Sequence, residues 1–115
     1  MGREHTLLFV DDEENILHAL RRLFRREDYT ILTATSGREG LELLEGNEVS
    51  LILSDQRMPQ MMGAEFLSHA RDISPCTIRI MLTGYSDIEA ATQAINEGEV
   101  YRYITKPWDD EQLKM

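Results

Sequence analysis

The sequence has a single cysteine, few basic residues and no long apolar run, and each shortage argues against a class of protein. Cys76 has no partner for a disulfide within the chain, which favours a reducing cytoplasm. No apolar stretch reaches the length of a membrane span, and we expect no signal peptide from residues 1–5. The formal net charge of -9 would repel nucleic acid, so we expect no direct nucleic-acid partner, and without an apolar span we expect no membrane partner.

The size and composition of the chain favour one domain that handles a cation. Its 115 residues are enough for a single domain over residues 1–115, and 42% of them are hydrophobic, which suffices for one core. His5, His18 and His69 are too widely spaced for a local zinc motif. The excess of acidic residues suits a domain that gathers carboxylates around a cation.

Short β-rich segments alternate with longer segments of helical periodicity. Strands are predicted over residues 6–10, 30–35, 49–54, 77–82 and 100–104, and helices over residues 13–26, 37–46, 63–72 and 87–96, with Ser36 as an N-cap. The acidic run at Asp109 predicts the first turn of a fifth helix. Such an alternation predicts an α/β fold in which a doubly wound, five-stranded parallel sheet is covered by helices on both faces.

Reactive polar residues follow four of the predicted strands. Asp11 and Asp12 follow the first strand, Asp55 the third, Thr83 the fourth and Lys106 the fifth. The carboxyl ends of parallel strands meet at one edge of the sheet, where ligands of α/β folds bind, so we expect these side chains to converge. At ~4 Å, each pair of carboxylates repels by up to about 4 kcal/mol. A Mg²⁺ ion, which prefers oxygen ligands, would offset this repulsion.

This set of groups suits phosphoryl transfer. A cation, the Lys106 ammonium and the Thr83 hydroxyl would form a clamp for a phosphoryl group, and Asp55 beside it can act as a nucleophile. Several of these residues also have a plainer interpretation. Asp11 and Asp12 could be acids at a helix N-terminus, Asp55 a turn residue before Pro59, and Lys106 an exposed loop lysine. Their convergence at one edge favours the phosphoryl site.

Four short motifs carry a resemblance to a known family. They are Phe9-Val10-Asp11-Asp12-Glu13, then Ser54-Asp55-Gln56-Arg57-Met58-Pro59 followed by Met61 and Gly63, then Leu82-Thr83-Gly84, and last Tyr103-Ile104-Thr105-Lys106-Pro107. In this order and spacing they resemble the receiver domain of bacterial response regulators over essentially the whole chain. The resemblance implies a flavodoxin-like fold with strand order 2-1-3-4-5.

The resemblance also implies a role for each matching residue. Asp55 stands where the family is phosphorylated. Asp11 and Asp12 match acids that hold Mg²⁺ together with Asp55, and the backbone carbonyl of Arg57 matches a further ligand. Thr83 matches the hydroxyl residue that bonds to the phosphoryl group.

The remaining roles concern the switch. Lys106 matches the lysine that pairs with the phosphoryl group, and the bond from Lys106 to Pro107 would be cis. Tyr103 occupies an aromatic switch position, and its ring is expected to turn inward as Thr83 moves toward the phosphate. A plainer interpretation makes Tyr103 an amphipathic residue of an edge strand.

Two bulky residues, Arg57 and Tyr85, occupy variable positions beside the site. We expect them to hinder the water that hydrolyses the aspartyl phosphate, so that replacing both by alanine shortens the phosphoryl lifetime about tenfold. Phosphate release would measure this. A simpler interpretation leaves Arg57 pointing to solvent. In the family the fifth helix runs well beyond residue 115, so we expect a domain cut within that helix, with an output domain beyond it.

As a receiver, the protein would be a signalling switch and not an enzyme, apart from its own phosphorylation and dephosphorylation. The resemblance implies a sensor histidine kinase or a histidine phosphotransfer protein as phosphodonor and an output domain as recipient; receivers also commonly dimerise. A phosphatase would place an acid where Arg57 stands. A flavodoxin-like cofactor binder would need a Gly-, Ser- or Thr-rich loop in place of residues 11–14. A receiver fold kept only as a scaffold fits poorly with the complete set of site residues.

Overall fold

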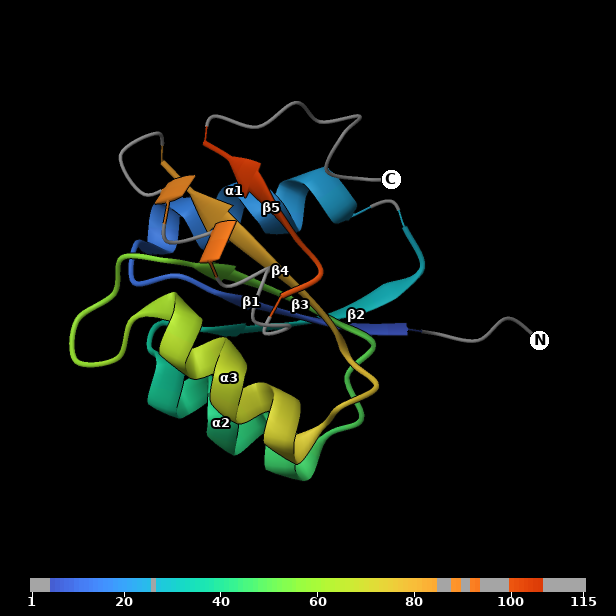
Figure 1. The fold of residues 1–115 in the computed structure, drawn as a ribbon. Coiled ribbons are helices and arrows are strands. Elements are labelled where there is room, and N and C mark those ends of the chain that lie inside the picture. Colours follow the sequence, from blue (N-terminus) through green and yellow to red (C-terminus); the bar gives the residue numbers. More distant parts are fainter. Residues whose placement is uncertain (1–4, 26, 85–87, 90–91, 94–99, 107–115) are drawn as a thin grey trace.

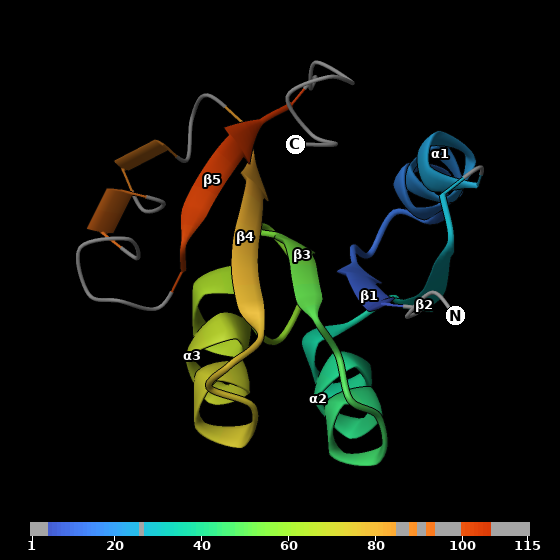
Figure 2. The ribbon, with the colours of Figure 1, turned by 90° about the vertical axis from the view of Figure 1, so that its right-hand side faces the viewer.

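The computed structural model describes residues 5–25, 27–84, 88–89, 92–93 and 100–106. Within them, parallel strands form one five-stranded sheet in the order β2-β1-β3-β4-β5 (Figure 1). The strands are β1 (His5–Val10), β2 (Tyr29–Ala34), β3 (Leu51–Asp55), β4 (Ile78–Thr83) and β5 (Arg102–Thr105), and the helices are α1 (Glu14–Phe24), α2 (Gly37–Gly46) and α3 (Gly63–Ile73). Helix α1 lies on one face of the sheet, and α2 and α3 lie on the other (Figure 2). The predicted fold class and strand order are confirmed.

Among the described residues, two apolar clusters hold this fold together, one on each face of the sheet. Neighbouring residues of β1 alternate between them: Leu8 belongs to the cluster under α2 and α3, and Phe9 belongs to the cluster under α1. The same alternation places Ile52 and Leu53 of β3 on opposite faces. Side chains of a strand point to the two faces in turn, so a strand covered on both faces must be apolar throughout. This is why the apolar runs predicted the central strands correctly.

The start of α2 is determined by local sequence. The Ser36 side chain accepts a hydrogen bond from the Glu39 backbone N–H at 3.1 Å, and the Glu39 carboxylate accepts one from the Thr35 N–H at 2.8 Å. This reciprocal pair resembles a capping box, and it satisfies the Glu39 N–H, which the helix itself leaves unpaired. The predicted N-cap at Ser36 is confirmed.

Several element boundaries differ from the prediction by one or two residues. The third strand begins at Leu51 and includes Asp55, the fourth includes Thr83, and the fifth begins at Arg102. A strand ends where its ladder of hydrogen bonds to a neighbouring strand ends, and a single segment does not contain that information. The helix predicted over residues 87–96 lies mostly outside the described residues, although residues 88–89 and 92–93 are helical. The predicted fifth helix lies outside them entirely.

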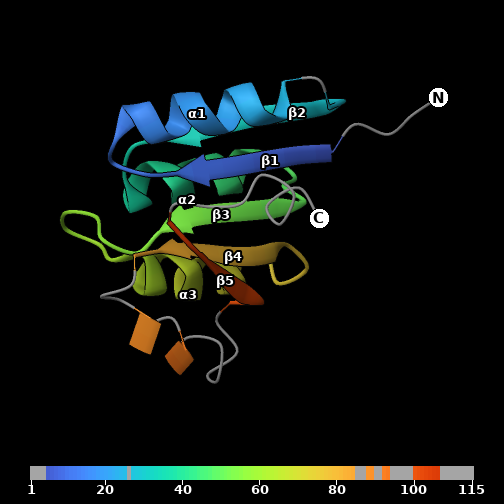
Figure 3. The same cartoon turned by 90° about the horizontal axis from the view of Figure 1, so that it is seen from above.

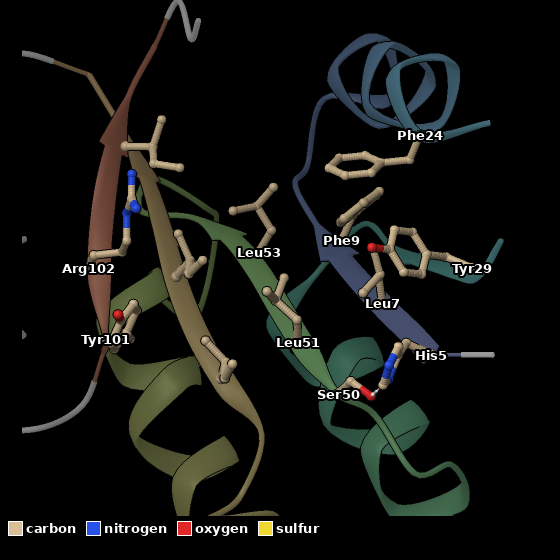
Figure 4. Close-up of a pocket in the computed structure, with 13 residues that line it drawn as sticks. His5, Leu7, Phe9, Phe24, Tyr29, Ser50, Leu51, Leu53, Tyr101 and Arg102 are labelled. Atoms are coloured by element: carbon tan, nitrogen blue, oxygen red, sulfur yellow. Dashed lines mark hydrogen bonds between the residues drawn. The ribbon is translucent and has the colours of Figure 1, made fainter. Parts of the chain in front are cut away.

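An apolar pocket of about 420 Å³ opens on the α1 face of the sheet (Figure 4). Leu7 and Phe9 of β1, Leu51 and Leu53 of β3, and Phe24 of α1 border the same space. The residues expected to handle a phosphoryl group are not among its lining residues, so this pocket is separate from the predicted site. In the part of the chain that the structure describes, no helix has the length and apolar character needed to cross a membrane.

Candidate functional site

Three acidic side chains meet at the carboxyl edge of the sheet. Asp11 follows β1 and Asp55 ends β3; these two strands are parallel neighbours, and their arrowheads point to the same edge (Figure 3). Asp12 joins them from the start of the loop to α1. One carboxylate oxygen from each of the three acids lies within 4.8 Å of the others. The structure thus brings together the acids that the sequence predicted to converge.

Lys106 joins this cluster from β5, on the other side of β4. Its Nζ atom lies 2.9 Å from Oδ1 of Asp55 and 3.1 Å from Oδ2 of Asp11. Its backbone N–H donates to the carbonyl of Thr83 at 2.8 Å, which holds the end of β5 against the end of β4. One ammonium group therefore bridges two carboxylates that belong to different strands.

Asp11 is the most constrained of the three acids. Only 1% of its surface is exposed, and its Oδ1 accepts a hydrogen bond from the Glu13 N–H at 2.9 Å while Oδ2 faces Lys106. Its own N–H donates to the carbonyl of Ala34 on β2 at 3.1 Å. Both oxygens and the backbone of Asp11 are thus held in place, whereas Asp12 is exposed.

Of the other residues predicted for the site, the structure describes Thr83, Tyr103 and Arg57 but not Tyr85 or Pro107. Thr83 is fully buried at the end of β4, where its hydroxyl donates to the Gly84 carbonyl at 3.2 Å. Tyr103 is half-buried and packs against the core cluster under α2 and α3. Arg57 is exposed. Tyr85 and the expected cis bond to Pro107 lie outside the described residues.

The cluster carries more negative than positive charge. Burial raises the pKa of Asp11 and of Asp55, and the hydrogen bonds and charge of Lys106 only partly oppose this. Burial by itself would lower the pKa of Lys106, but the hydrogen bonds and charges of Asp55 and Asp11 outweigh it, so that pKa is raised. Three carboxylates thus share one ammonium, and a further cation would stabilise the ionised cluster.

The donor atoms fit a Mg²⁺ ion. Mg²⁺ binds hard oxygen ligands, commonly one or two carboxylates together with waters and phosphate oxygens. Asp11, Asp12 and Asp55 offer oxygens close enough to surround one ion. The Lys106 ammonium adds a positive charge from the protein itself, and it lies close enough to the carboxylates to contact an anion bound beside the ion.

We expect Asp12→Asn to weaken Mg²⁺ binding at least about tenfold, because it removes the charge of one of the three carboxylates that could hold the ion. The same change relieves repulsion within the cluster, so the Mg²⁺-free protein should unfold at the same or a higher denaturant concentration. Calorimetric titration with MgCl₂ and urea unfolding test the two effects. Glu48→Gln removes an equal charge from an exposed loop and should change neither. A lower unfolding midpoint for Asp12→Asn would contradict the assumed repulsion.

Gln56, next to Asp55, is a buried residue that nothing in the sequence singled out. Gln56, between Asp55 and Arg57, is only 6% exposed, and its side chain accepts a hydrogen bond from the Ala64 N–H at 2.8 Å. A polar residue after a strand ordinarily indicates a solvated loop, so the sequence contains no signal for its burial. Its contact with α3 depends on how the loop folds back.

Comparison with known proteins agrees with this geometry. The family model of the response regulator receiver domain matches residues 7–115. The chain is also similar to the hydrogenase transcriptional regulatory protein HoxA of Bradyrhizobium diazoefficiens, with 42% identity over 113 residues, which cover 98% of this chain and 23% of that protein. The chain therefore spans less than a quarter of the length of this curated relative.

Solved structures are similar as well. The signal receiver domain of an HD domain-containing protein from Pseudomonas fluorescens Pf-5 has a TM-score of 0.91 and 42% identity, over 97% of this chain and 90% of that chain. A response regulator protein from Burkholderia pseudomallei, solved with a phosphorylated aspartic acid, a calcium ion and citrate, has a TM-score of 0.87 and 27% identity, over 96% and 65% of the two chains.

Receiver domains of response regulators act in phosphorylation-dependent signalling, bind Mg²⁺ at an acidic pocket and are generally not enzymes. Histidine kinases phosphorylate them, and they are linked to output domains, as in the relatives of this chain. Because the family model covers residues 7–115 and the sheet has the strand order 2-1-3-4-5, the chain belongs to the response regulator receiver domain family.

Proposed function

We propose that this chain is a signalling switch in which Asp55 accepts the phosphoryl group. Asp11, Asp12 and Asp55, with the backbone carbonyl of Arg57, would hold Mg²⁺. The observation that supports this most directly is the position of Lys106 Nζ, 2.9 Å from Asp55 Oδ1, beside the three clustered carboxylates. The residues proposed as nucleophile, metal ligands and charged partner lie at one edge of the sheet: Asp55 ends β3, Asp11 follows β1 and Lys106 follows β5.

The residues have distinct tasks in the transfer. A carboxylate oxygen of Asp55 attacks the phosphorus atom of the donor; a new O–P bond forms, and the donor group leaves with the electron pair of the broken bond. Lys106 favours the ionised form of Asp55 before the reaction and donates to a phosphoryl oxygen afterwards. The Thr83 hydroxyl donates to a second phosphoryl oxygen. Bound Mg²⁺ would offset the charge of the acids and of the incoming phosphoryl group.

The test is intact mass after incubation with acetyl phosphate and MgCl₂. We expect one added phosphoryl group on the parent and none on Asp55→Asn. Asp72→Asn, an exposed acid in α3, is the matched control and should be phosphorylated like the parent. An equal yield for Asp55→Asn and the parent would reject Asp55 as the acceptor.

The partners follow from the same proposal. A sensor histidine kinase or a histidine phosphotransfer protein would supply the phosphoryl group, and an output domain in the same protein would respond to it. The relative HoxA is a transcriptional regulator by name, which supports an output in transcription control. A cytoplasmic location and dimerisation belong to the proposal as well.

The response would pass through Thr83 and Tyr103. A phosphoryl group brings about -1.5 to -2 charges, which would draw Thr83 and Lys106 toward it. The Tyr103 ring, half-buried against the core, would then fill the space beside Thr83. We expect beryllium fluoride with Mg²⁺ to shift the NMR signals of the Tyr103 ring toward a buried environment. A ring with the same exposure in both states would remove Tyr103 from the switch.

A longer phosphoryl lifetime due to Arg57 and Tyr85 stays a prediction. Arg57 lies two residues beyond Asp55, a position that supports a contact with the phosphoryl group or the approaching water. Phosphate release from Arg57→Ala, beside the parent, measures its share of the effect.

A further inference from the structure

Gln56 connects the phosphoacceptor strand to helix α3. Its backbone N–H donates to the Leu82 carbonyl on β4 at 3.2 Å, which prolongs the ladder between β3 and β4. Its own carbonyl accepts from the Gly63 N–H, and its side-chain Oε1 accepts from the Ala64 N–H, both at 2.8 Å. Gln56 is thus bound on one side to the sheet and on the other to the first turn of α3.

Helix α3 relies on Gln56 for its start. The N-cap residue Met62 makes no side-chain hydrogen bond to the helix, in contrast with Ser36 at the start of α2. The first N–H groups of a helix have no partner within it and need acceptors from elsewhere. The carbonyl and the side chain of Gln56 provide acceptors for two of them, at Gly63 and Ala64.

The backbone around Asp55 is held just as closely. The Ser54 hydroxyl donates to the Asp55 carbonyl at 2.9 Å. A side chain on Gly63 would place its Cβ 2.2 Å from that carbonyl oxygen, so α3 begins directly against the phosphoacceptor backbone. Beyond Arg57, Met58 is only 5% exposed and belongs to the core under α2 and α3. The carbonyl of Arg57 therefore lies between two anchored residues, Gln56 and Met58.

From this arrangement we infer that Gln56 is a positioning residue for the Mg²⁺ site. The hydrogen bond from Ala64 N–H to the Gln56 side chain keeps the backbone from Asp55 to Arg57 in the orientation that the metal ligands require. Mg²⁺ demands near-octahedral geometry, so a small displacement of a ligand lowers affinity. The same bond links occupancy of the site to the first turn of α3. This inference rests on the proposed function, because it concerns the metal ligands named there.

Two substitutions separate positioning from general stability. Gln56→Met keeps the length of the side chain but removes the acceptor, and it should raise the Mg²⁺ dissociation constant about tenfold. Gln56→Glu keeps an acceptor for Ala64 N–H and should stay within about threefold of the parent. The matched control is Ser36→Ala, which removes the equivalent bond from α2. It should lower the unfolding midpoint as Gln56→Met does, yet leave the Mg²⁺ affinity unchanged.

Calorimetric titration of each folded protein with MgCl₂ gives the affinities. Equal affinity of Gln56→Met and the parent would overturn the inference, and so would equal weakening by Ser36→Ala, which would indicate general loosening. If the parent itself does not bind Mg²⁺, the metal site of the proposed function fails and the inference fails with it. If the parent binds Mg²⁺ and Gln56→Met binds equally well, only the inference fails.

A measurement on the unmodified chain covers the case in which Gln56→Met does not fold. Mg²⁺ should slow amide hydrogen exchange at Gly63 and Ala64, because occupied ligands hold the Gln56 backbone more firmly. The Glu39 N–H, bound by Ser36 in the first turn of α2, is the internal reference and should change less. Equal changes at Ala64 and Glu39 would show that Mg²⁺ does not act through Gln56.

Discussion

Acetyl phosphate should phosphorylate the Lys106→Met variant about 100-fold more slowly than the parent. The substitution removes the charged hydrogen-bond donor beside the carboxylate proposed to accept the phosphoryl group. In the structure the Lys106 ammonium lies 2.9 Å from the carboxylate of Asp55, the residue proposed as nucleophile, and 3.1 Å from the carboxylate of Asp11. The rate would be followed by intact mass at saturating MgCl₂. Arg38→Met is the control: it removes one positive charge from an exposed pair with Glu42 at 3.9 Å, and should leave the rate unchanged. A Lys106→Met rate near that of the parent would remove Lys106 from the transfer.

The same variant should also destabilise the Mg²⁺-free domain at neutral pH. Removing the ammonium leaves Asp11 and Asp55 ionised and largely buried, which costs about 2 kcal/mol. This loss of stability is smaller than that expected on breaking a fully buried ion pair, because the Lys106 side chain is 21% exposed. Urea unfolding without Mg²⁺ measures the loss. Added Mg²⁺ should recover part of it, because the ion supplies the missing positive charge.

The stability loss should depend on pH with a definite sign. The folded-state pKa values of Asp11 and Asp55 are raised above 3.8, so their contribution to stability is present below that value and is lost as pH rises through the raised pKa values. Lys106 opposes this loss in the parent, and its own raised pKa keeps it charged throughout that range. The difference between parent and Lys106→Met should therefore be small near pH 3 and grow toward pH 7. A difference that shrinks with rising pH would contradict the cluster as described.

Gly63→Ala should destabilise the domain by about 3 kcal/mol. The added Cβ would lie 2.2 Å from the Asp55 carbonyl oxygen and 2.9 Å from the Gln56 Cα, and both are backbone atoms that no side-chain rotation can move away. Relief requires α3 to shift from the end of β3, which also moves Asp55. Urea unfolding gives the stability change, and phosphorylation of the folded fraction should slow as well.

Gly46→Ala is the matched control for that substitution. Gly46 ends α2, and an added Cβ there meets nothing within 4 Å. Alanine is preferred over glycine in a helix, so the free energy of unfolding of this variant should rise by about 0.5 kcal/mol or more. If the free energy of unfolding of Gly63→Ala lies within about 0.5 kcal/mol of that of the parent, α3 does not begin as close to Asp55 as the structure indicates.

The elements of the fold and their arrangement were largely determined by the sequence alone. The apolar runs of β1 and β3 predicted central strands because both of their faces are buried, and Ser36 with Glu39 determined the start of α2 within four residues. The convergence of Asp11, Asp55 and Lys106 was predictable too. A parallel sheet brings the ends of its strands to one edge, whichever residues the strands contain.

Only the tertiary structure decided the contacts within the site. Lys106 reaches Asp11 across 95 positions of the chain, and whether it bridges two acids or points to solvent depends on the relative placement of three strands. Gln56 looks like a loop residue in the sequence, and it is buried because the chain folds back so that α3 begins beside it. Local patterns report the preferences of residues a few positions apart. Distances between side chains from different elements are set by packing of the whole domain, which no local pattern contains.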